Sequence, residues 1–125
     1  MPSQNNSGAQ HQKRFAVTVV ATAKISANSV VSYGGKHADN TGGLQDSQGI
    51  SEHDAEIGDA VSVVTDYSYL VVAGSSIAFG QFVLPFSEGD GSVVPGTKAN
   101  HCGRALGTAV AGQLVEVQIL PHVSP

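Results

Sequence analysis

The stretch GRALGTAVAGQLVEVQIL, which spans Gly103–Leu120, decides how the chain is expected to fold. Its first half holds glycines and small residues, while its second half alternates apolar and polar side chains with the period of a β-strand. This pattern has two interpretations: a glycine-rich loop that cradles a phosphate ahead of a helix, or a pair of closely packed strands. The alternation predicts that Val115, Val117 and Ile119 face the core, and that Glu116 and Gln118 face outward or toward a neighbour.

The glycines of this stretch lack the spacing of a nucleotide-binding loop. Gly103, Gly107 and Gly112 miss the dinucleotide fingerprint, and no strand–helix–strand unit follows them. Upstream, GSVVPGTK (Gly91–Lys98) carries Gly-Thr-Lys where a phosphate loop requires Gly-Lys-Ser/Thr. We therefore predict a hairpin in which the three packing glycines allow close backbone approach. Its parts are a thin strand, a turn and a closing strand, at Gly103–Val110, Ala111–Gln113 and Leu114–Leu120.

The rest of the chain also consists of short β-segments separated by turns rich in glycine, aspartate and asparagine. Strands are predicted at residues 15–20, 30–33, 60–65, 67–72 and 93–94, with hairpin turns at residues 65–66 and 88–91. Ser51 and Asp54 resemble a capping box, so one helical turn is expected over Glu52–Ala55. No clear internal repeat is visible. The pattern indicates an all-β domain, either a small barrel or a sandwich.

Composition and charge exclude several classes of function. The chain has 125 residues, enough for one domain, and only 13% of them are charged, about half of the usual ~25%. Such a weakly charged surface favours association with partners. No Lys or Arg lies between residues 39 and 90, where the acidic residues concentrate. Nucleic-acid binding needs a basic stripe and is therefore not expected, and the acidic region is interpreted as a solvated outer face.

No catalytic, cofactor-binding or metal site is expected. Cys102 is the single cysteine, so an intramolecular disulfide is impossible. His101 and Cys102 are neighbours on an expected strand and point to opposite faces, so they cannot form a nucleophile–base pair; Cys102 is interpreted as a packing residue. The histidines do not share a metal-ligand spacing. No apolar run reaches the ~20 residues that span a membrane, and no secretion signal is apparent.

Residues 1–14 are polar, lack apolar periodicity and are predicted to form a flexible N-terminal arm, followed by a single domain at residues 15–125. One interpretation is a frayed terminus, and the other is an arm that becomes ordered on a partner by adding to a sheet edge. The candidate contact residues of the arm are Gln10, Gln12, Lys13, Arg14 and Phe15.

The order of several motifs across Phe15–Leu120 resembles the capsid cement, or head-decoration, proteins of tailed bacteriophages. These motifs are ISANSVVSYGGKHAD, AEIGDAVSVVTDYSYLVVAGSSIAFGQFV, GDGSVVP and the closing GRALGTAVAGQLVEVQIL. The most specific matches are Gly58-Asp59 with Val61 and Val63, Val72-Ala73-Gly74, and Ile77 with Gly80. With this resemblance we expect a small β-barrel or β-tulip-like domain with short strands, at most one or two short helical turns, and an extended N-terminal arm.

The resemblance also implies a function without chemistry. Such proteins bind the outer surface of the capsid, commonly as homotrimers at three-fold and quasi-three-fold sites, and bridge subunits of the major capsid protein. The chain would be made in the cytoplasm of the bacterial host and would reside on the exterior of the virion, with no cofactor. Two alternatives stay open: a receptor- or carbohydrate-binding β module of a phage tail or spike, and a small β-barrel enzyme or cofactor carrier. The few aromatic residues disfavour the first, and the lack of a convergent polar site disfavours the second.

Overall fold

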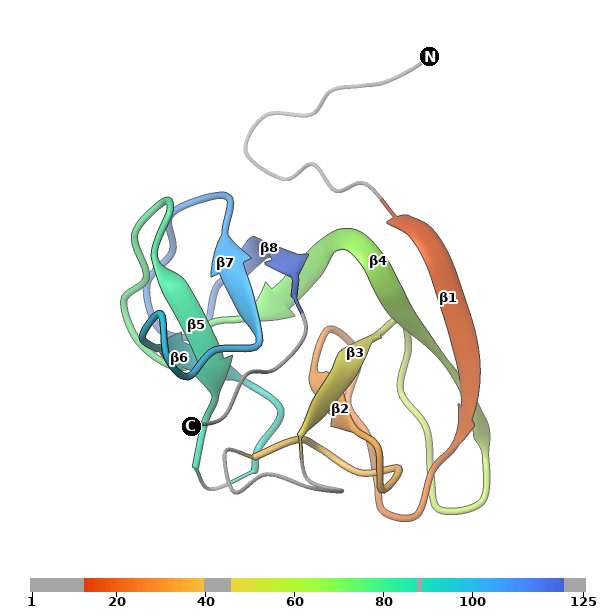
Figure 1. The fold of residues 1–125 in the computed structure, drawn as a ribbon. Helices are drawn as coiled ribbons and strands as arrows, with labels where there is room; N and C mark the ends of the chain where they lie inside the picture. The colour runs from red at the N-terminus through yellow and green to blue at the C-terminus, as the bar shows by residue number, and fades with distance from the viewer. Residues whose placement is uncertain (1–12, 40–45, 88, 121–125) are drawn as a thin grey trace.

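The computed structural model describes residues 13–39, 46–87 and 89–120, and over these ranges the chain contains strands and turns but no helix (Figure 1). The predicted all-β class is therefore confirmed. The strands are β1 (Lys13–Val20), β2 (Val30–Ser32), β3 (Ser47–Ser51), β4 (Ala60–Val72), β5 (Phe82–Pro85), β6 (Val93–Pro95), β7 (Gly103–Ala105) and β8 (Leu114–Ile119).

The strands form one curved, nearly closed sheet of eight strands (Figure 1). Its order is β2-β3-β4-β8-β7-β5-β6, and β1 pairs with β4 outside this path. The long strand β4 crosses the whole molecule, so that one half of it lies beside β1 and β3 and the other half beside β8. This arrangement matches the expected small barrel with short strands.

The hairpin turn expected at Thr65-Asp66 is absent, because β4 runs without a break from Ala60 to Val72. Locally, threonine and aspartate are common in turns. In the folded chain, however, Phe15 of β1 pairs with Asp66, and Ser68 pairs with Gln118 of β8, so backbone partners continue on both sides of the expected turn. Tertiary pairing overrides the local preference, and the two predicted strands are one.

The helical turn expected at Glu52–Ala55 is also wrong, and Ser51 does not cap a helix. Ser51 ends β3, is fully buried and pairs with Val63 of β4. Its hydroxyl donates to the carbonyl oxygen of Ser26 at 2.6 Å and accepts the Ser29 N–H at 3.1 Å. The Ser51 hydroxyl thus joins β3 to the segment before β2 and does not cap a helix, because a buried hydroxyl needs hydrogen-bond partners.

The sheet contains the same structural unit twice, with β4 shared between the two. The first repeat consists of β1, β2, β3 and the first half of β4; the second consists of the second half of β4, β5, β7 and β8. Equivalent register pairs are Val19–Val61 and Val71–Val115, Val30–Ile50 and Phe82–Arg104, and Ile50–Val64 and Arg104–Gln118. The chain therefore contains an internal repeat that is not visible in its sequence.

Each repeat also contains two similar turns, each of which leads into a strand. The residue near the end of each turn has a positive φ: Asn28 (57°), Gly58 (90°), Gly80 (83°) and Gly112 (89°). Three positions earlier in each turn lies a buried apolar residue, and these bridge in antiparallel pairs, Ile25 with Ala55 and Ile77 with Ala109. The repeat conserves backbone conformation and burial while changing most side chains, which hides it in the sequence.

Apolar side chains from both repeats fill the interior of the sheet. Val115 and Val117 are each 2% exposed, as the alternation in β8 predicts, and Ile119 packs against the same core. Glu116 lies on the other face, where it accepts a hydrogen bond from the hydroxyl of Ser68 at 2.7 Å. The core-facing set of this strand is therefore confirmed, while Glu116 and Gln118 are each partly buried.

Close backbone packing occurs at equivalent glycines of the two repeats. A Cβ at Gly103 would lie 2.5 Å from Val117 Cγ1 and 2.6 Å from the Gln118 carbonyl oxygen. At Gly49 the same clash would involve Val63 and the Val64 carbonyl oxygen. Each glycine thus lets a short strand lie directly against its neighbour.

The other two glycines of the C-terminal stretch have different surroundings. At Gly107 the nearest atom to an added Cβ, Val115 Cγ2, lies 3.8 Å away, which is ordinary contact. At Gly112 there is open space, but φ is 89°, a conformation that L-residues rarely adopt.

We predict that Gly103→Ala destabilises the protein by roughly 1–3 kcal/mol, because the methyl group overpacks backbone that cannot move without disrupting β8. The matched variant Gly107→Ala, in the same segment, should remain close to the parent chain in stability. Urea unfolding of the three proteins measures the difference. Equal stabilities of the two variants would contradict the packing role of Gly103.

His37 lies where the two repeats close on each other. Its Nε2 accepts the N–H of Ser26 at 3.0 Å, and the Val30 N–H donates to the Gly91 carbonyl oxygen at 2.9 Å beside it. Burial lowers the pKa of His37 below its usual 6.5, although the Asp90 carboxylate and a hydrogen bond with the Gly89 backbone act in the opposite direction. The neutral imidazole therefore belongs to the folded state.

A histidine with a lowered folded-state pKa binds fewer protons in the folded chain than in the unfolded chain. The free energy of unfolding should accordingly fall as the pH drops below about 6.5, down to the folded-state pKa of His37. Urea unfolding at pH 7.5 and pH 5.5 measures this change, and His37→Gln should reduce it. An unchanged pH dependence in the variant would assign the effect to other groups.

Candidate functional site

The side chains most capable of covalent chemistry have structural roles. Cys102 is buried in the core, and this burial raises the pKa of its thiol to about 12, far from a reactive thiolate. His101 is buried against the ring of Phe82, with a centroid distance of 4.6 Å, and its Nδ1 lies 3.2 Å from the Thr97 carbonyl oxygen. Cys102 is thus the packing residue that the sequence predicts.

The acidic side chains are used to hold turns. Asp54 accepts the Ala27 N–H at 2.7 Å, Asp59 accepts the Glu56 N–H at 3.1 Å, and Asp90 accepts the Ser92 N–H at 2.9 Å. Across residues 13–39, 46–87 and 89–120, no group of three His, Cys, Asp or Glu side chains gathers as metal ligands. The same ranges hold no helix long and apolar enough to cross a membrane.

The candidate contact residues of the arm fall at and before the start of β1. Gln10 and Gln12 lie outside the described residues, whereas the backbones of Lys13 and Arg14 already belong to β1. Phe15 follows with 60% of its surface exposed. The register with β4 shifts on both sides of Phe15, as at a β-bulge. The start of β1 is therefore irregular in its pairing and carries an exposed apolar side chain at Phe15.

The outer edge of β1 differs from the equivalent edge in the second repeat. There, the edge of β4 is covered: the Val72 N–H donates to the Asn28 carbonyl oxygen at 2.9 Å, and Asn28 Nδ2 donates to the Leu70 carbonyl oxygen at 3.0 Å. The equivalent positions on β1 are Val20 and Thr18, and both are exposed. Within the described ranges no turn equivalent to Asn28 covers them, and the Gly35 backbone lies close to the Val20 carbonyl oxygen. The part of β1 from Thr18 to the Val20 N–H therefore offers an edge for pairing.

Several large apolar side chains are exposed, mainly on β1 and in the turns that lead into strands. They are Phe15, Val20, Tyr33, Ile57, Phe79, Val110 and Leu114. They lie on several separate elements, so each is a local apolar site on the surface. The alternation in β1 indicated that Val20 lies on the face opposite Val17 and Val19. The exposed turn residues have no sequence signal that separates them from core residues.

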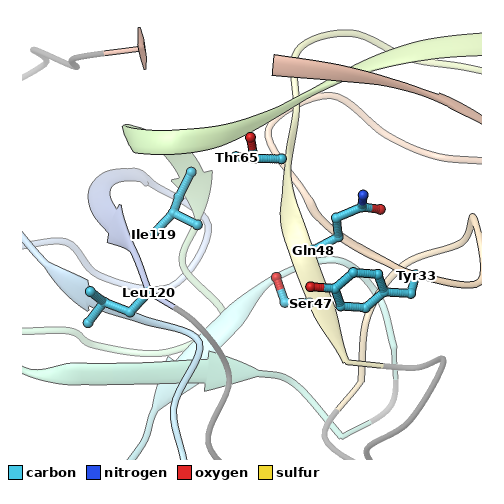
Figure 2. A pocket seen from close by; sticks show the side chains of 6 residues that line it. All are labelled: Tyr33, Ser47, Gln48, Thr65, Ile119 and Leu120. Carbon is cyan, nitrogen blue, oxygen red and sulfur yellow. The ribbon is translucent and has the colours of Figure 1, made fainter. Parts of the chain in front are cut away.

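A cleft of about 280 Å³ lies between the two repeats (Figure 2). Its lining comes from the loop after β2, from β3, from the middle of β4 and from the end of β8, as Tyr33, Ser47, Gln48, Thr65, Ile119 and Leu120. Hydroxyl, amide and aliphatic groups make a surface for binding, and no carboxylate, imidazole or thiol is among them. Sequence reasoning missed this cleft because it exists only when β4 runs unbroken through Thr65.

Comparison with known proteins places this architecture in a family. Among solved structures, the N base of the head fiber from bacteriophage phi29 is similar, with a TM-score of 0.60 and 22% sequence identity, over 89% of this chain and 98% of that chain. At this identity the likeness shows the fold alone. Curated proteins give no match. The sequence matches the phage cement protein family over residues 9–119, so the chain belongs to that family of structural proteins of the virion capsid.

Proposed function

We propose that the chain binds the outer surface of a tailed-phage head as homotrimers at three-fold and quasi-three-fold sites, where it stabilises the head by bridging subunits of the major capsid protein. The observation that carries this proposal is the family match, which takes in all of the described strands. A cement function requires binding surface rather than chemistry, and the buried Cys102 and turn-holding carboxylates agree with a protein that is not an enzyme.

In this proposal the N-terminal arm, expected at residues 1–14, provides the contact with the capsid, and its last two residues, Lys13 and Arg14, also begin β1. Lys13 and Arg14 carry the last charges of the arm, and Phe15 exposes its ring next to them. An extended segment can add to a sheet edge of the capsid protein and gain backbone hydrogen bonds without disturbing the domain. In a trimer, the second and third arms bind at high effective concentration once the first has docked.

The charge distribution supports an exterior position. Acidic residues without any Lys or Arg occupy residues 39–90, and the turns that carry Asp54, Glu56 and Asp59 are exposed. Acidic turns of this kind are repelled by packaged nucleic acid and are well solvated outside the particle. Nucleic acid is accordingly not among the proposed partners.

We predict that deletion of residues 2–12 weakens binding to heads that lack the protein and leaves the domain folded. This deletion ends just before β1, so the free energy of unfolding should stay close to that of the full chain. Occupancy is measured by co-sedimentation with purified heads over a concentration series. The matched control, deletion of residues 121–125, removes a terminus outside the family match and should retain binding.

Equal occupancy by the full chain and the arm deletion would refute the contact role of the arm. A deletion that also lowers the free energy of unfolding would instead place residues 2–12 within the fold of the domain.

A further inference from the structure

Within the chain, a turn of the first repeat packs on the edge of the first strand of the second repeat. In the first repeat the turn Ala27-Asn28 covers the edge of the strand that opens the second repeat, with Asn28 bonded to both Val72 and Leu70. The covered residues Ala27, Asn28 and Val72 are all partly buried. A turn of one repeat therefore fits the first strand of the next.

The described parts of the chain also contain a second turn and a second strand edge of this kind, and these two do not contact each other. The turn of the second repeat that corresponds to Ala27-Asn28 is Phe79-Gly80, because Gly80 donates its N–H to Ala105 as Asn28 does to Ser51. The strand edge that corresponds to the covered edge of β4 is the outer edge of β1. Figure 1 shows β1 and β5, which directly follows this turn, on opposite sides of the molecule, so one chain cannot bring them together.

The side chains at the two unmatched positions are apolar and exposed. Val20, which corresponds to Val72, is 62% exposed, and Phe79, which corresponds to Ala27, is 70% exposed. Their neighbours on the two surfaces, Thr18 on β1 and Ala78 in the turn, are uncharged. The charge beside the turn is that of Arg104, which already donates its Nε to the Gly80 carbonyl oxygen. Burial of Phe79 against Val20 would remove apolar surface from water at both sites.

The polar groups also correspond. The Val20 N–H is the equivalent of the Val72 N–H, which donates to Asn28 within the chain. The acceptor equivalent to the Asn28 carbonyl is that of Gly80, which accepts Arg104 Nε at 2.8 Å. A carbonyl oxygen has two lone pairs, so Gly80 can also accept an N–H from a second molecule.

We propose that a second copy of this chain docks its Phe79-Gly80 turn onto the outer edge of β1 at Thr18–Val20. The contact is head-to-tail: each copy gives its turn to one neighbour and its β1 edge to another. Such a contact closes into a ring when the rotation between neighbouring copies completes a full turn. The number of copies in the ring, three, rests on the proposed function. The contact itself does not.

The test uses cysteine pairs in the full-length protein, Val20→Cys in one preparation and Phe79→Cys in another. Native Cys102 can stay in place, since it is buried and the pKa of its thiol is raised to about 12. After mixing at high protein concentration with mild oxidation, a disulfide-linked dimer should form between the two variants. Neither variant alone should give it above the level of the parent chain.

The matched control replaces Phe79→Cys by Ile57→Cys, which lies in a turn of the first repeat and is 73% exposed. Mixed with Val20→Cys, it should give no linked dimer. A second readout is the mass of the assembly by light scattering: Phe79→Asp should give monomers, and Ile57→Asp should keep the parent's assembly. Thermal unfolding verifies that both variants fold, as expected for exposed turn positions.

Three results would overturn the proposal. Self-linking of Val20→Cys alone would show that two β1 edges pair symmetrically. Linking of Val20→Cys with Ile57→Cys that is as efficient as with Phe79→Cys would show that the contact is unspecific. A parent chain that stays monomeric at the highest concentration would show that the contact does not form. The experiment contains no capsid, so failure here leaves binding to heads intact, and failure of head binding leaves this contact intact.

Discussion

The unbroken pairing of β4 on both of its halves is the constraint on which the rest of the structure depends. Its first half lies between β1 and β3, and its second half pairs with β8, so one strand serves as the last of one repeat and the first of the next. Because β4 is continuous through Thr65, the two repeats stay joined, and Thr65 lines the cleft between them. Two short, glycine-rich units are thereby joined. The larger apolar cluster combines Val30 and Ile50 with residues of the second repeat, and a second cluster, around Ile25, Val31 and Val61, belongs to the first repeat.

Much of the fold could be predicted from local sequence, and the part that could not depends on tertiary partners. Alternation correctly gave β1, β2 and the core face of β8, and the glycine-rich turn before Ser92 correctly gave the β5–β6 hairpin. The strand through Thr65-Asp66 and the buried hydroxyl of Ser51 contradict their local patterns, because partners distant in sequence decide both. The repeat was hidden because its equivalent turns share backbone angles rather than side chains.

The candidate site, like the fold, could be predicted from the sequence only in part. Sequence singled out the arm and three glycines, and the structure adds what surrounds them: Phe15 exposed at a bulge, Gly103 pressed against β8, and Gly112 held at positive φ. The cleft between the repeats and the uncovered edge of β1 had no signal in the sequence, since each requires strands that meet only after folding. Two carboxylates, Asp54 and Asp59, hold turns, and Cys102 is buried in the core.

Cryo-electron microscopy of purified particles tests the central claim, a capsid-bound structural role, most directly. The account predicts density for the β-domain on the outer surface of the head at local three-fold axes, with the N-terminal end of β1 directed toward the capsid protein. Density for this chain only on the tail, or none on the head, would contradict it.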